Sequence, residues 1–148
     1  MRNVLRITAP AALLALAGTL FAGGLLTLQL GNPEASPEAR KLNAVLTVKS
    51  AGCVDPSTTK ISATAIGNVN GEERKIPLKL EALSTPGMFA LTQQWPKEGR
   101  WVIRLEATNG SLFATSLVSA GPDGVDRFHE KAARQPFEEA DIEAMLRQ

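Results

Sequence analysis

The sequence predicts a mainly β protein, a small antiparallel sandwich or barrel of six or seven strands. Apolar and polar residues alternate with a period of two from residue 42 to residue 118, in short runs separated by turn residues roughly every ten positions. Two Asn-Gly pairs, which begin at Asn70 and Asn109, stand between alternating runs, as they do in tight β-hairpins. A hydrophobic helix is expected before this region and a short helical segment after it.

The chain has 148 residues, which is the length of one ordinary domain. We expect an N-terminal signal peptide or signal anchor over residues 1–30 and a linker over residues 31–41, where Pro33 and Pro37 interrupt any apolar period. The sandwich is expected over residues 42–120 and a helical tail that packs on it over residues 121–148. Residues 42–148 should therefore fold without the N-terminal segment.

The N-terminal segment has the pattern of an export signal. Arg2 and Arg6 precede an uncharged, Leu-rich stretch from residue 7 to residue 30, which is longer than a cleaved signal peptide needs and long enough to span a bilayer. Its length favours a retained anchor, whereas Ala15-Leu16-Ala17 matches a cleavage site. A buried helix of a soluble domain is disfavoured because the stretch has no polar face. The basic residues keep its start in the cytoplasm, so the domain is expected outside, in the periplasm or anchored at the inner membrane.

The two Asn-Gly pairs also predict registers, because a two-residue loop fixes which residues face each other. Six strands follow from the alternation, at residues 43–49, 61–69, 73–83, 88–94, 101–108 and 111–120. The first hairpin should place Ala65 opposite Ile76, Ala63 opposite Leu78 and Ile61 opposite Leu80; the second should place Leu105 opposite Ala114 and Trp101 opposite Val118. Both registers collect apolar residues on one face. Pro77 cannot donate to a ladder, so its strand should lie at an edge or contain a bulge.

The C-terminal region changes to a helical pattern after the turn residues 121–124. We expect helices over residues 126–134 and 136–148, with Pro136 opening the second. The second helix has an apolar stripe that includes Ile142 and Met145. This stripe should cover a face or edge of the sandwich, the alternative being a contact with a partner.

One stretch in the middle of the chain resembles a known family. The residues Pro86-Gly87-Met88-Phe89, the run Gln93-Gln94-Trp95-Pro96, and then Gly99-Arg100-Trp101-Val102-Ile103 are similar to the pattern of exported bacterial immunoglobulin-like domains of the YtkA and FixH type. The resemblance covers residues 76–105. It implies an immunoglobulin-like sandwich whose second aromatic residue, Trp101, packs in the core. Some relatives of that type handle copper or assist the assembly of respiratory oxidases.

Charge and composition exclude several classes of function. The 16 basic and 15 acidic residues alternate instead of forming the basic face that nucleic-acid binding requires. No phosphate-binding loop, serine-hydrolase elbow or zinc-protease helix is present, and adjacent carboxylates such as Glu138 and Glu139 do not converge on regular elements. We predict no enzymatic activity, no cofactor and no catalytic residue.

Few residues offer ligands or nucleophiles. Copper binding would need Cys53, His129, Met88 and Met145 to converge, and their spacing has no characteristic pattern. Cys53 with His129 has the residue types of a thiol nucleophile and its base, without a flanking motif. We expect no metal site, a partly buried Cys53 that is able to bridge two chains, and a solvent-facing His129 on a helix. Trp95 and Trp101 are expected in the core instead of on a sugar-binding surface.

These observations favour a non-catalytic extracytoplasmic module that binds or positions another extracytoplasmic or membrane protein. Its contact with the membrane would run through the N-terminal segment if that segment is not cleaved. The alternatives are an accessory in metal handling or respiratory-complex assembly, which the resemblance implies, and an enzyme with a site that the sequence does not reveal.

Overall fold

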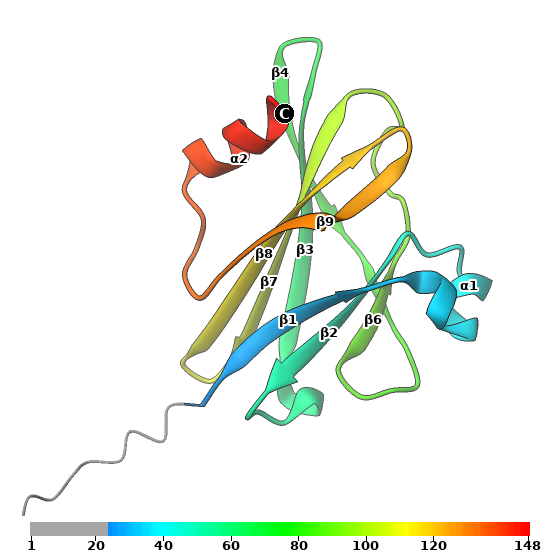
Figure 1. Cartoon of the computed structure of the whole chain (residues 1–148), viewed down its shortest axis with the longest axis vertical. Helices are drawn as coiled ribbons and strands as arrows, with labels where there is room; N and C mark the ends of the chain where they lie inside the picture. Colours follow the sequence, from blue (N-terminus) through cyan, green and yellow to red (C-terminus); the bar gives the residue numbers. More distant parts are fainter. Residues whose placement is uncertain (1–23) are drawn as a thin grey trace, which may run out of the picture.

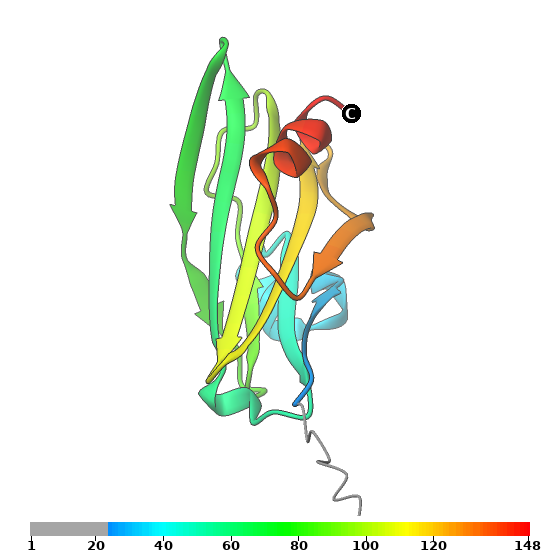
Figure 2. The same ribbon diagram turned by 90° about the vertical axis from the view of Figure 1, so that its left-hand side faces the viewer.

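The computed structural model describes residues 24–148. Most of the predicted N-terminal hydrophobic helix lies outside these residues. Two antiparallel sheets pack face to face, which confirms the predicted β-sandwich (Figures 1 and 2). One sheet has the strand order β1-β2-β6-β5 and the other the order β4-β3-β7-β8-β9. The strands are β1 (Leu26–Gly31), β2 (Leu46–Gly52), β3 (Lys60–Val69), β4 (Glu72–Leu78), β5 (Leu80–Ala82), β6 (Met88–Leu91), β7 (Arg100–Asn109), β8 (Leu112–Gly121) and β9 (Gly124–Ala133).

Strand β1 corrects the predicted start of the domain. It lies in the segment assigned to the export signal, yet it pairs with β2 along its whole length and places Leu26 and Leu28 in the core. Its sequence alternates Leu with Thr and Gln, which is a strand pattern. The alternation was hidden because the strand continues an uncharged, Leu-rich segment. The folded domain therefore begins near Leu26 instead of residue 42.

The predicted linker is also folded. Residues Pro33–Ala35 form the 3₁₀ turn η1 and Pro37–Lys41 form α1, which buries Ala39. The Asn32 side chain accepts a hydrogen bond from the Glu34 N–H, and the Ser36 hydroxyl accepts one from the Ala39 N–H. A capping residue followed by Pro is a helix-start signal, and the two Pro residues act in this way instead of as linker residues.

The first hairpin has the predicted register at two of three pairs. Ala65 lies opposite Ile76 and Ala63 opposite Leu78, across a loop in which Asn70 and Gly71 have positive φ as a type I′ turn requires. Ile61 has no partner on this side, because β4 ends at Leu78 and the chain continues into the other sheet as β5. Pro77 lies in β4, which is an edge strand, as predicted.

The second hairpin differs from the prediction by two residues. Its loop is Gly110-Ser111, with a φ of 58° at Gly110, the position that takes Gly in a type II′ turn. Trp101 consequently faces Ala120 and Leu105 faces Ser116. A shift of two residues leaves every side chain on the same face of the sheet, so the inward orientation predicted for Trp101 and Leu105 is correct.

The C-terminal region corrects a second prediction, because residues 126–134 belong largely to strand β9 and not to a helix. One helix follows, α2 (Glu139–Leu146), and Pro136 precedes it without opening it. Ile142 and Met145 of α2 pack on the outer face of the five-stranded sheet, against Ile66, Val102 and Leu117.

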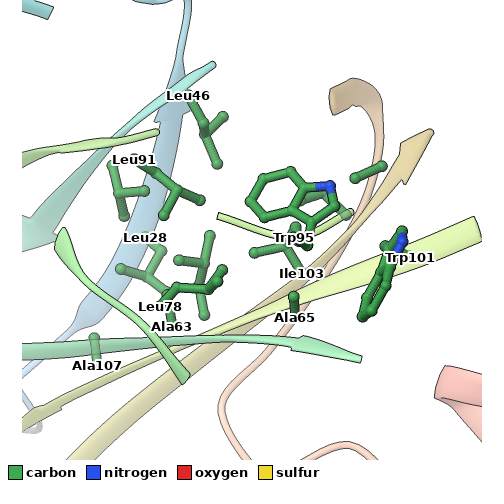
Figure 3. Packing of buried hydrophobic residues seen from close by; sticks show 14 of the residues in the cluster. Leu28, Leu46, Ala63, Ala65, Leu78, Leu91, Trp95, Trp101, Ile103 and Ala107 are labelled. Atoms are coloured by element: carbon green, nitrogen blue, oxygen red, sulfur yellow. The ribbon is translucent and has the colours of Figure 1, made fainter. Parts of the chain in front are cut away.

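The main core lies between the two sheets. Figure 3 shows the labelled leucines of both sheets on one side of Ile103 and Trp101 at the opposite end of the apolar cluster, with Trp95 between them. Trp101 is 1% exposed, and its indole N–H donates to the Glu98 carbonyl at 3.0 Å. Both tryptophans are buried, so neither offers a face to a sugar.

Candidate functional site: the β8–β9 hairpin

The pairing of β9 with β8 is interrupted by a bulge of four residues. Leu117 faces Lys131 and Ser119 faces Asp126, so residues 127–130 stand opposite Val118 alone. The additional residues cannot continue the ladder, and the chain bends outward at this point. In Figure 2 the β9 segment projects from the side of the sandwich beneath α2. We call residues 126–130 the β9 bulge.

Asp126 holds the β9 bulge in shape with both of its carboxylate oxygens. Oδ1 accepts a hydrogen bond from the Phe128 backbone N–H at 3.0 Å, and Oδ2 lies 2.7 Å from His129 Nδ1. An ionised carboxylate can only accept, so the imidazole Nδ1–H donates. This hydrogen bond, together with that from Phe128, keeps the pKa of Asp126 below its usual range. Both contacts favour the observed shape of the bulge.

Phe128 occupies the outermost position of the β9 bulge. Its side chain is 88% exposed, and the Arg127 guanidinium carbon lies 5.6 Å from the centre of its ring. Among residues 24–148 the other exposed large hydrophobic side chain is Leu42, at 41%. An Arg at this distance makes a cation–π contact that restrains the ring. The hairpin thus presents a restrained aromatic side chain to solvent.

A groove of about 610 Å³ lies beside the bulge. Asp126 and His129 line it from the bulge, residues 119–124 line it from the β8–β9 turn, and Arg100, Trp101, Met145 and Gln148 complete it. Pro122, Ala120 and Met145 make part of the lining apolar. Of its charged groups, Asp126 is bound to His129, whereas Arg100 and Asp123 make no ion pair within the described part of the chain.

The groove does not assemble a hydrolytic triad. Asp126 orients His129, as the acid of a Ser-His-Asp triad orients its base, and Ser119 lines the same groove. None of the hydrogen bonds among residues 24–148 joins Ser119 to His129, and the His129 side chain is 79% exposed to water. The Asp126 contacts with Phe128 and His129 stay within the backbone turn of the bulge.

The residues that the sequence suggested as ligands lie on separate elements. Cys53, which was expected to be partly buried, is an exposed free thiol just after β2, and Met88 lies on β6. Met145 lies on α2 and is buried between this helix and the sheet. His129 is exposed as expected, but it lies on strand β9 instead of a helix. Within residues 24–148, no three His, Cys, Asp or Glu side chains come together as a cation site. The structure therefore joins His129 to Asp126 and not to Cys53.

Phe128 was not among the candidate site residues expected from the sequence. The helical interpretation of residues 126–134 gave this side chain no special position. A signal was present, because the turn residues Gly121-Pro122-Asp123-Gly124 directly follow a predicted strand and suit a turn into a returning strand; the hairpin loop is Pro122-Asp123, with Gly121 opposite Gly124. On an edge strand, Phe128 would then have been a candidate for exposure.

No protein-family model matches the chain, and neither the curated proteins nor the solved structures contain a match. In the described residues, neither helix has the length and apolar character needed to cross a bilayer.

Proposed function

We propose that this chain is a non-catalytic, extracytoplasmic binding module that holds another protein through the β9 bulge and the adjoining groove. The observation that carries the proposal is Phe128, a large apolar side chain that is exposed and yet restrained. Burying such a side chain against a partner contributes about 1.5 to 3 kcal/mol. Little conformational entropy is lost on binding, because Asp126 already fixes the backbone.

The strand order supports an immunoglobulin-like assignment within the sandwich class. The sheet β1-β2-β6-β5 has the arrangement of strands A, B, E and D in immunoglobulin domains, and β4-β3-β7-β8 has that of C′, C, F and G. Strand β9 is then an addition at the edge next to G. Domains of this architecture commonly bind through side chains displayed at their edges and loops, so an added, bulged edge strand is a suitable place for a contact.

The proposed compartment rests on Arg2, Arg6 and the apolar segment after them. The arrangement in Figure 1 is compatible with it, because β1 starts at one end of the sandwich whereas α2 and the β3–β4 hairpin lie towards the other. A domain held by its N-terminal segment would direct α2 and the groove beside it away from the membrane.

Cys53 provides a test of the compartment. It is the single cysteine and it is exposed, so a membrane-impermeant maleimide should label it in intact spheroplasts. A cytoplasmic thiol protein and a Cys53→Ser variant serve as the unlabelled controls. Labelling that occurs only after the cells are lysed would contradict the extracytoplasmic assignment.

Binding is tested by the native size of the chain in cells that produce it. We expect a complex larger than the monomer, retained by Leu42→Ser and lost by Phe128→Ser, because both variants remove an exposed hydrophobic side chain and only one of them alters the bulge. Circular dichroism of both purified variants confirms that they are folded. A monomer in the unmodified protein, or equal behaviour of the two variants, would count against the proposal.

A further inference from the structure

We propose that the partner is a second copy of this chain, in a two-fold contact in which Phe128 of each copy enters the groove of the other. This inference rests on the proposed function and specifies its partner. In a two-fold contact the same surface serves both copies, so that surface must present a projection and a matching depression side by side. The β8–β9 hairpin presents both.

The projection and the groove belong to one short segment. Asp126 and His129 line the groove, and Phe128 lies between them in the sequence without lining it. The ring thus stands at the border of the groove and points to solvent, with 88% of its surface exposed. Two hairpins that face each other across a two-fold axis can each place this ring over the groove opposite.

The groove has the size and chemistry to receive a phenyl ring. Its volume of about 610 Å³ lies in the range of pockets that hold drug-sized ligands, so it has room for a phenyl ring. Pro122, Ala120 and Met145 supply apolar contact, and Arg100 supplies a guanidinium able to lie over an incoming ring. Arg100 has no carboxylate partner among the described residues that would hold it elsewhere.

The charges beside the ring and at the groove are complementary. Arg127 accompanies Phe128 on the bulge, and Asp123 lies at the groove in the β8–β9 turn. Neither makes an ion pair within residues 24–148. When Phe128 enters the opposite groove, Arg127 approaches Asp123 of the other copy, and the two-fold axis repeats the pair. Such pairs add specificity to a contact whose affinity comes mainly from the aromatic side chain.

The contact is expected to involve side chains and not a continuous sheet. Edge strands pair with a second strand when they are flat, whereas the four residues displaced opposite Val118 twist this part of β9 out of line. The bulge therefore protects the edge against open-ended strand addition. The closed, two-fold arrangement is then the mode of association that uses Phe128.

Sedimentation equilibrium of the purified full-length chain tests the inference, in mild detergent if the N-terminal segment is retained. We expect a reversible monomer–dimer equilibrium whose dissociation constant rises about 100-fold or more in Phe128→Ser, since both copies lose the ring. Leu42→Ser, the matched control, should leave it unchanged. A chain that is monomeric at all concentrations, or a dimer indifferent to Phe128→Ser, would overturn the inference.

A charge exchange sharpens the test. Asp123→Arg and Arg127→Asp should each weaken the dimer, and the double variant should recover most of the affinity, since the pair is restored with its signs reversed. Failure of the double variant to recover would refute the pairing.

If the purified chain is monomeric while complexes in cells still depend on Phe128, the partner is a different protein. If Phe128-dependent binding appears only on vesicles of anionic phospholipid, the occupant is the membrane. Either result rejects a second copy of the chain as the partner. Binding to a different protein leaves the proposed function intact.

Discussion

Trp101 shows how single residues determine the packing of this sandwich. Its indole lies against Gly67 on the neighbouring strand β3, where an added Cβ would overlap the six-membered ring. Gly67 is therefore required by the size of its neighbour and not by its backbone conformation. The ring N–H donates to the Glu98 carbonyl, so its single polar group is satisfied although the residue is buried.

Replacing Trp101 tests this packing. Trp101→Ala removes the largest fully buried side chain and leaves a space beside Gly67 that the strands cannot close. We expect a loss of about 3 to 5 kcal/mol in the free energy of unfolding, measured by urea denaturation of residues 24–148. At a concentration at which the chain is monomeric, Phe128→Ala, which removes an exposed ring, should change it by less than about 0.5 kcal/mol. A loss below about 1 kcal/mol for Trp101→Ala would mean that the indole is not packed as described.

Asp126 predicts a pH dependence at the bulge. Its pKa is lowered in the folded chain, mainly by the hydrogen bond with His129, so the contribution to stability is fully present above the pKa of a free aspartate, about 3.9. That contribution disappears as the pH falls through the lower, folded pKa. In NMR titrations, His129→Ala should move the pKa of Asp126 back towards its ordinary value, and hydrogen exchange at the Phe128 amide should increase. An unchanged Asp126 titration would contradict the geometry of the bulge.

At the scale of elements, the sequence predicts strand register best where the turn residues and the apolar alternation agree. The Asn70-Gly71 loop fixed two pairs of the β3–β4 hairpin, because the turn and the alternation specify the same register. At Asn109-Gly110 the loop lies one residue further along, and only the face of each side chain was predictable. The sequence also placed Pro77 on an edge, because a residue without an N–H cannot occupy a central strand.

Two strands were missed for identifiable physical reasons. Strand β1 continues an uncharged, Leu-rich segment, so composition concealed an alternation that is clear once Thr27 and Gln29 are considered as outward positions. Strand β9 has its alternation broken by the bulge and carries the charges of a solvent-exposed edge, a composition that suits a helix equally well. The turn residues 121–124 could have indicated a returning strand with Phe128 exposed on it, whereas the groove and the contact with Arg127 depend on the bulge, which the sequence does not show. Asp126 and His129 lie close enough in the sequence to have been considered together.

Strand β1 makes a prediction about truncation. A chain that starts at residue 42 lacks Leu26 and Leu28, whose burial contributes about 3 to 6 kcal/mol, and it exposes the edge of β2. That loss is comparable with the whole stability of a small domain. Residues 24–148 should unfold cooperatively in urea, whereas residues 42–148 should be largely unfolded or aggregated by circular dichroism and light scattering. Equal unfolding midpoints for the two fragments would show that β1 is dispensable.

At the scale of the molecule, the two faces of the five-stranded sheet are both occupied. The inner face forms the core, and α2 covers Ile66, Val102 and Leu117 on the outer face. Because Ile142 and Met145 of α2 pack on this sheet, the apolar stripe of the helix is not free to contact a partner. The added edge, where β9 turns away from the ladder at its bulge, is the surface to which we propose to assign recognition (Figure 2). This is the basis for assigning recognition to the hairpin and not to the helix.

The most direct test of binding through the β9 bulge is site-specific photo-crosslinking in living cells. A benzophenone amino acid is placed at position 128 in one strain and at position 42 in another, so that the two exposed hydrophobic positions of the described chain are compared. Binding through the bulge predicts a discrete covalent adduct from position 128, with the mass of a dimer if the partner is a second copy, and no such adduct from position 42. An absence of adducts from position 128, or the same products from both positions, would contradict it.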